Sequence, residues 1–241
     1  MALKRTASVV LSVPTAKKAR KMSRKKSSRA AYKLSNRSKG PMPSEFVTQL
    51  SYAAQVETTA GTPIWVFRMN SLFDPDRTGV GHQPYGRDQL ANIYNRYRVN
   101  GFKYEVWGAN ASGGTNHAIN IHAVPVDEVA SAAAFTSAIQ CMEQPGSKTA
   151  IATCSSSTAA VGGEAAYVTG YIDLAHLTGR SKAQYRADDR YQSEMGDNPA
   201  EAMDFFVAAT NIGTGSYEEG AFTVKLTYFV ELFDSKVLPT S

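Results

Sequence analysis

Hydrophobic and polar residues alternate along most of the chain from Phe46 onward, which is the period of a β-strand. The alternation is clearest near the C-terminus, where apolar residues from Phe222 to Leu232 are interleaved with polar ones such as Lys225 and Glu231. β-Branched and aromatic residues are frequent, and glycine and proline separate the alternating runs. The pattern predicts eight strands, over residues 46–57, 62–71, 97–109, 117–125, 148–156, 166–174, 203–211 and 221–233.

Helical spacing occurs only in the connections between these strands. Residues 88–97 predict a short helix with an aspartate near its start, and the alanine-rich stretch 128–141 predicts a second one. The polar stretch 179–200, with four acidic and four basic residues, predicts a long exposed loop. Eight strands with long connections indicate an all-β fold, an eight-stranded antiparallel jelly-roll sandwich with short helical insertions.

The first 40 residues differ sharply from the rest of the 241-residue chain. They hold 13 of the 26 basic residues and none of the 21 acidic ones, so the remaining residues carry a net charge of −8. Tyr32 is the one aromatic residue among them. Such a stretch cannot bury enough apolar surface to offset its ordering entropy. We therefore expect residues 1–42 to form a disordered basic arm and residues 43–241 to form the folded shell domain, with the boundary near the Gly40-Pro41-Met42-Pro43 run.

A cluster of 13 like charges indicates a polyanionic partner, because each basic side chain that meets a phosphate releases a condensed counterion. The predicted nucleic-acid-binding residues are Lys4, Arg5, Lys17, Lys18, Arg20, Lys21, Arg24, Lys25, Lys26, Arg29, Lys33, Arg37 and Lys39. The subset Lys17, Lys18, Arg20 and Lys21 also reads as a nuclear localisation signal, which implies nuclear import receptors as partners.

The sequence contains no recognisable catalytic or metal-binding motif. The four histidines are scattered, there is no nucleophile elbow, and we expect no catalytic residue, no metal site and no cofactor. Asp74 and Asp76 could share a calcium ion, although the Asp-Pro-Asp run also suits a plain turn. Cys141 and Cys154 read as small buried hydrophobic residues. No apolar run approaches the roughly 18 residues of a membrane-spanning helix, so no membrane insertion is expected.

One region of about 35 residues resembles capsid proteins of small circular Rep-encoding single-stranded DNA viruses. It begins at Phe67 and ends at Gly101, and it contains Asp-Pro-Asp, Gly-His-Gln-Pro and Tyr-x-x-Tyr-x-Val segments in that order. The residues that carry the resemblance are Asp74, Pro75, Asp76, Gly79, Gly81, His82, Gln83, Pro84, Gly86, Tyr94 and Tyr97. The resemblance implies that they are structural and interface residues, with the glycines allowing tight backbone paths and Pro84 stiffening one.

The resemblance further implies a coat protein that self-assembles into an icosahedral shell of about 60 copies, a T=1 arrangement. Its partners would be other copies of the chain, a single-stranded DNA genome bound without sequence preference, and an unidentified host receptor; its location would be the virion and, during assembly, the host nucleus. We also expect assembly because the connections carry apolar residues, including Leu90, Ile93, Tyr94 and Phe135.

Two alternatives stay open. The first is a coat protein of a small or satellite RNA virus, since such viruses have similar jelly-roll coats. The second is a non-viral nucleic-acid-binding β-sandwich, which predicts a monomer or small oligomer and base-reading aromatic residues near the basic ones. The aromatic residues lie almost wholly outside the arm, so base stacking within the arm is not supported.

Overall fold

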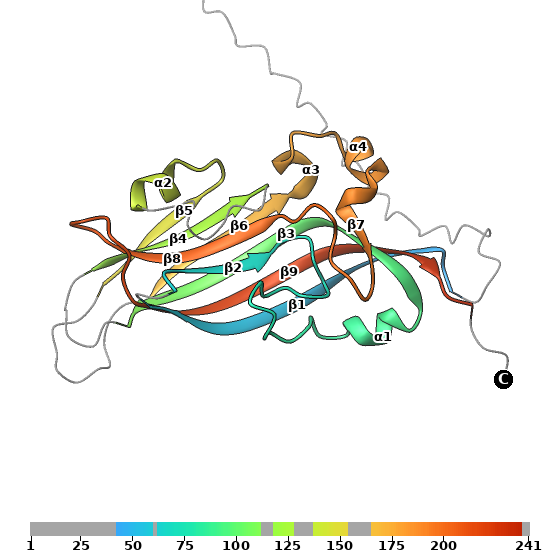
Figure 1. Cartoon of the computed structure of the whole chain (residues 1–241), viewed down its shortest axis with the longest axis horizontal. Helices are drawn as coiled ribbons and strands as arrows, with labels where there is room; N and C mark the ends of the chain where they lie inside the picture. Colours follow the sequence, from blue (N-terminus) through green and yellow to red (C-terminus); the bar gives the residue numbers. More distant parts are fainter. Residues whose placement is uncertain (1–41, 60–61, 112–117, 128–136, 154–164, 238–241) are drawn as a thin grey trace, which may run out of the picture. The chain divides into compact units, whose positions relative to one another are not determined.

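The computed structural model describes residues 42–59, 62–111, 118–127, 137–153 and 165–237 (Figure 1). These residues form strands β1 (Glu45–Thr58), β2 (Ile64–Arg68), β3 (Tyr94–Asn110), β4 (Ile119–Val126), β5 (Lys148–Ala152), β6 (Ala166–Asp173), β7 (Gln192–Glu194), β8 (Asp204–Asn211) and β9 (Gly220–Ser235). The short helices are α1 (Arg87–Ala91), α2 (Ala138–Glu143), α3 (Leu174–Leu177), α4 (Lys182–Ala187) and the 3₁₀ turn η2 (Asp189–Tyr191).

The strands form two antiparallel sheets that pack face to face (Figure 1). One sheet has the order β1-β9-β3-β6, with β7 pairing to the N-terminal end of β3, and the other has the order β2-β8-β4-β5. The chain crosses between the sheets at most connections, so hydrogen-bonded neighbours are distant in sequence. This is the strand order of a jelly roll, and the predicted fold class is confirmed. The eight expected strands are present, with β7 as a short addition.

Alternation along the strands builds the core between the sheets. The inward residues of β9 are fully buried, and Tyr228 packs edge-on against Phe102 of β3 at a ring-centroid distance of 5.5 Å. Phe205 of β8 reaches across from the other sheet to Phe102 at 5.4 Å and to Tyr104 at 4.6 Å. Tilted pairs at these distances add about 1 kcal/mol each beyond the area that they bury. The aromatic rings therefore hold the two sheets together.

Part of the outer face of the β2-β8-β4-β5 sheet is also covered. Helix α2 lies beside this sheet (Figure 1). Cys141 of this helix packs in a small cluster with Ile64, Val124 and Phe206. β8 is consequently buried on both faces along nearly its whole length. Cys141 is a buried residue, as predicted; Cys154 lies outside the described residues.

The prediction of a helix over residues 88–97 is wrong in its second half. Helix α1 ends at Ala91, and β3 begins at Tyr94, which pairs with Ser235 of β9. Residues Tyr94 and Tyr97 therefore belong to a strand of 17 residues. Pairing with β9, which runs alongside, outweighs the helical spacing, because it extends the sheet through Arg96 and Tyr97 and places both tyrosines in the core. Of the helix expected over 128–141, α2 contains only the last residues, and 128–136 lie outside the described residues.

The prediction of an exposed loop over residues 179–200 is also wrong. Helix α4, η2 and β7 lie within it, and Tyr185, Tyr191 and Met195 are buried. Tyr185 donates its hydroxyl to the backbone oxygen of Val99 at 2.9 Å, which fixes the segment to β3. Some of the charged residues that suggested a loop pair within the segment, as Asp188 does with Arg190 at 2.8 Å, and others pair with the sheet, as Arg186 does with Glu231. A polar sequence is compatible with this ordered cover because these charges are paired.

His122 gives the fold a pH dependence. It is fully buried on β4, with its ring nitrogens 2.9 Å from Thr149 Oγ1 and 2.7 Å from Thr210 Oγ1. Burial lowers the pKa of His122 to about 4. The unfolded chain, with an ordinary histidine pKa, takes up the proton first, so stability falls as pH drops from about 6.5 towards 4.

We expect this one group to make the chain about 3 kcal/mol less stable at pH 4 than at pH 7. Urea denaturation at both pH values, for the natural chain and for His122→Gln, isolates the contribution. The variant keeps hydrogen-bonding groups for the two threonines and should lose less stability on acidification. An equal loss in both proteins would contradict the assignment.

Candidate functional site

Residues 67–101 connect β2 to β3 and include the start of β3. The Asp74-Pro75-Asp76 run folds back along β2, since Arg68 N donates to Pro75 O at 2.8 Å and Arg77 N donates to Val66 O at 3.1 Å. The Arg68 side chain also forms an ion pair with Asp74. The run therefore extends the edge of β2 rather than projecting as a free loop.

Asp76 organises the turn that follows. One carboxylate oxygen accepts hydrogen bonds from Thr78 N at 3.0 Å and Thr78 Oγ1 at 2.8 Å, and the other accepts from Trp65 Nε1 at 3.3 Å. Gly79 N donates to Asp76 O at 3.0 Å and closes the turn. Both carboxylates of the candidate calcium pair thus face donors of the same chain. The described parts of the chain hold no group of three or more His, Cys, Asp or Glu residues placed to bind a metal.

Three glycines of this segment occupy positions where a larger residue would strain the backbone or clash with a neighbouring side chain. Gly79 and Gly86 have φ values of 77° and 84°, in the left-handed region that favours glycine. A Cβ on Gly81 would lie 2.7 Å from Asp76 Cβ and 2.8 Å from Tyr52 Oη. The segment therefore lies against β1 more closely than a side chain at Gly81 would permit.

The Gly-His-Gln-Pro residues make contacts within the chain. His82 stacks on Tyr52 of β1 with ring centroids 4.5 Å apart, and burial raises the pKa of Tyr52 to about 12, helped by the nearby carboxylates. Gln83 donates to Phe73 O at 3.0 Å and accepts from Arg87 at 2.9 Å. Pro84 O accepts from Arg87 N at 3.1 Å at the start of α1. Together these contacts fix the course of the loop before α1.

The two tyrosines at the start of β3 join distant segments. Tyr97 donates its hydroxyl to Asp197 O at 2.9 Å and accepts from Leu72 N at 3.3 Å, which links this segment to the β7–β8 connection. Tyr94 donates to Pro43 O at 3.1 Å, directly before β1. Both side chains are almost completely buried. They act as structural links between segments.

Asp204, a buried acidic residue that contacts this region, is not identified from the sequence. Asp204, at the start of β8, is completely buried and forms an ion pair with Arg77. Burial raises the pKa of Asp204 to about 6, against the attraction of Arg77 and Arg68. No local pattern marks Asp204, because its partner is 127 residues away.

A buried charge cluster lies on the other sheet. Glu231 of β9 points away from the core but is only 3% exposed. Its carboxylate accepts from Arg98 at 3.5 Å and Asn100 at 3.3 Å, and it forms an ion pair with Arg186 of α4. Arg98 also donates to Gln192 of β7. The cluster therefore holds the α4–β7 segment onto the sheet, a role that the strand pattern does not indicate.

The predicted nucleic-acid-binding site is not part of the described structure. All 13 basic residues of the arm, Lys4 to Lys39, lie outside the described residues. Among the residues that the structure describes, no helix is long and apolar enough to cross a membrane.

Three of the apolar residues expected to face neighbouring copies are buried or partly buried against the core of their own chain. Tyr94 is buried in the core of its own chain, and Leu90 and Ile93 pack against that core; Phe135 lies outside the described residues. Large exposed apolar residues are found at other places, among them Val80 and Tyr85, which are 84% and 93% exposed in the loop before α1.

The sequence matches no protein-family model and no curated protein. Among solved structures, the chain is similar to a semi-empty virus-like particle of the giant freshwater prawn Macrobrachium rosenbergii nodavirus, with 9% identity and a TM-score of 0.45 over 83% of this chain and 100% of that one. For Cocksfoot mottle virus, identity is 15% and TM-score 0.46 over 80% and 96% of the two chains. For the decameric BFDV capsid protein, the values are 11% and 0.32 over 78% and 99%.

Proposed function

We propose that this chain is a viral coat protein that assembles into a closed shell and binds single-stranded nucleic acid through its basic arm. The observation that carries the proposal is the division of charge, with 13 basic residues in the arm and a net charge of −8 on the rest of the chain. The arm supplies the attraction for phosphate, and the acidic jelly roll forms the wall. The role is structural rather than catalytic.

Residues 67–101 support the same proposal through the resemblance that they carry. Their hydrogen bonds run to β1, to β2 and to the β7–β8 connection of the same chain, so they set the shape of a rigid surface loop. This loop presents Val80 and Tyr85 to the outside. We assign it to contacts between copies, with about 60 copies in the simplest icosahedral shell.

The genome that the shell packages is proposed to be single-stranded DNA. The resemblance favours single-stranded DNA, and a chain that neutralises phosphates binds it without sequence preference. Digestion of the nucleic acid recovered from assembled particles with DNase or with RNase separates this from an RNA-virus coat. The Lys17, Lys18, Arg20 and Lys21 cluster would direct the chain to the host nucleus, so the virion and the nucleus are its proposed locations.

Sedimentation and negative-stain electron microscopy of the purified chain, with and without nuclease, test the proposal. We expect closed particles of uniform size that protect nucleic acid from digestion. A chain that stays monomeric at micromolar concentration across salt and pH would overturn it. A monomer or small oligomer that still binds nucleic acid would instead identify the non-viral binding module.

A further inference from the structure

The outer face of the β1-β9-β3-β6 sheet carries exposed aromatic side chains in two groups. Trp107 of β3 and Tyr167 of β6 are directly opposite each other, with ring centroids 5.1 Å apart, and they are 38% and 47% exposed. Tyr171 of β6 is 58% exposed, and its ring lies 5.4 Å from that of Phe229 on β9. We call these four residues the aromatic face. Their ring surfaces are available to planar ligands.

The spacing of the two groups suits a nucleotide chain. Tyr171 and Tyr167 are four residues apart on one strand, which separates them by about 13 Å. Thr169, Glu105 and Lys225 occupy the row between them on this face, and the Glu105 carboxylate accepts a hydrogen bond from the Tyr167 hydroxyl at 3.2 Å. A four-stranded sheet with aromatic residues on an open face is the arrangement by which RNA-recognition domains stack two or three bases.

The charge around the aromatic face is complementary to phosphate. Lys103 and Lys225 have their Nζ atoms 3.3 Å and 3.9 Å from the Glu105 carboxylate. Lys148 of β5 donates to Thr169 O at 2.7 Å, at the edge of the same face. Lys103 and Lys225 thus flank the Glu105 carboxylate, Lys148 lies at the β6 edge, and Glu57 lines the hollow beside Trp107. A polyanion crossing this part of the sheet meets three lysines and two carboxylates, a small local excess of positive charge on a body whose net charge is negative.

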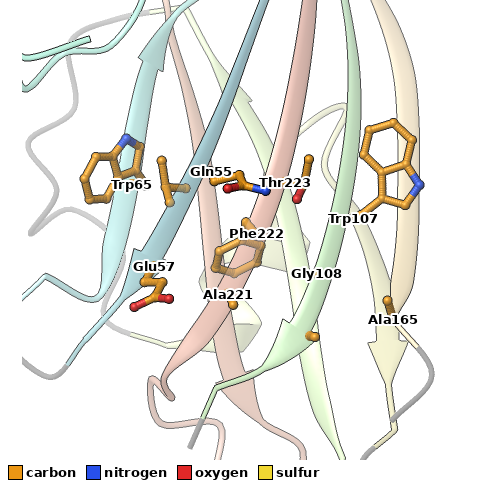
Figure 2. Close-up of a pocket in the computed structure, with 11 residues that line it drawn as sticks. Gln55, Glu57, Trp65, Trp107, Gly108, Ala165, Ala221, Phe222 and Thr223 are labelled. Carbon is orange, nitrogen blue, oxygen red and sulfur yellow. The ribbon is translucent and has the colours of Figure 1, made fainter. Parts of the chain in front are cut away.

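A hollow of about 670 Å³ lies beside Trp107 and offers room for a base. Gln55 and Thr223 line it, together with Trp65 from β2. Figure 2 shows the indole of Trp107 on one side, that of Trp65 on the other, and the Gln55 and Thr223 side chains between them. The Gln55 amide supplies both a donor and an acceptor for the edge of a base.

The arm makes nucleic acid the occupant of this face. Its 40 residues end shortly before Glu45, the first residue of β1 in the same sheet, and can extend to about 130 Å at most. A strand held by the arm is therefore tethered to the chain that carries the aromatic face, which raises its effective concentration there. We propose that the aromatic face stacks the bases of single-stranded nucleic acid, while the arm neutralises its phosphates. This inference rests on the proposed function.

The test uses tryptophan fluorescence of the full chain. The chain has two tryptophans, so Trp65→Phe leaves Trp107 as the reporter. We expect a short oligothymidylate to quench Trp107 emission and an abasic deoxyribose-phosphate strand of equal length to leave it unchanged.

At high salt, where phosphate neutralisation is weakened, Trp107→Leu and Tyr171→Leu, made in the natural chain, should each reduce affinity for oligothymidylate roughly ten-fold. Met142→Leu, a change at a similarly exposed apolar residue on α2 of the other sheet, should leave affinity unchanged, and circular dichroism verifies folding.

Three outcomes would overturn the inference. Equal emission with both strands and unchanged affinity in the two variants, while the full chain still binds at low salt, would remove base stacking and leave the proposed function intact. A blue shift of Trp107 that depends on protein concentration alone would show that a second copy covers the face. Absence of binding at low salt would overturn the proposed function and this inference with it.

Discussion

Deletion of residues 1–40 is expected to abolish nucleic-acid binding at low salt and leave the fold intact. The deletion removes 13 basic residues and no acidic one, and the remaining chain, with a net charge of −8, repels phosphate. Within the described residues, every strand begins at or after Glu45 and the core begins at Leu50, so the deletion leaves this core complete. The aromatic face alone offers a few stacking contacts, which cannot replace the phosphate neutralisation supplied by the arm.

Filter binding of single-stranded DNA at several salt concentrations measures the effect. If all the arm's charges meet phosphates, log K should fall with log salt with a slope of about −9 for the full chain. Affinity should differ little between unrelated sequences of equal length. Circular dichroism of the truncated chain verifies folding. A folded, truncated chain that binds as tightly as the full one would show that the arm is not the nucleic-acid-binding element.

The strands could be predicted because every second residue of a strand faces the core, so the alternation of apolar and polar residues is visible in the sequence. In β9, alternate residues from Phe222 to Leu232 are buried as the pattern indicates. Along β3 the same reasoning fails at Tyr94 and Tyr97. Their spacing suits a helix as well as a strand, and only the position of β9 beside them decides between the two.

The burial of Glu231 on the outer face of β9 could not be predicted, because the segment that covers it, α4 to β7, is distant in the sequence from most of the sheet. Glu231 follows the polar side of the β9 alternation together with Lys225, and Lys225 is half exposed as the pattern indicates. Glu231 is buried because α4 and β7 lie over it. The aromatic face could not be predicted for a different reason, since its residues are exposed as the pattern indicates but their proximity depends on strand pairing. Trp107 and Tyr167 occupy outward positions of their strands, and only the register of β3 with β6 brings them together.

Replacement of Glu231 by alanine is expected to destabilise the chain by about 3–5 kcal/mol. The change leaves the guanidinium of Arg98, which is only 8% exposed, without its opposite charge. Burial already lowers the pKa of Arg98, and Glu231 is the main group that offsets this effect. Arg186 is half exposed, so Arg186→Ala should cost less than about 1 kcal/mol.

The double variant Arg98→Met with Glu231→Leu separates the loss of charge compensation from the loss of packing. With both charges replaced by apolar side chains of similar size, most of the stability should return, because no unpaired buried charge remains. Urea denaturation followed by circular dichroism measures all four proteins. A double variant as unstable as Glu231→Ala would mean that the cluster stabilises through the shape and hydrogen bonds that Gln192 and Asn100 recognise. In that case the α4–β7 segment is held to the sheet by its polar contacts rather than by the ion pair.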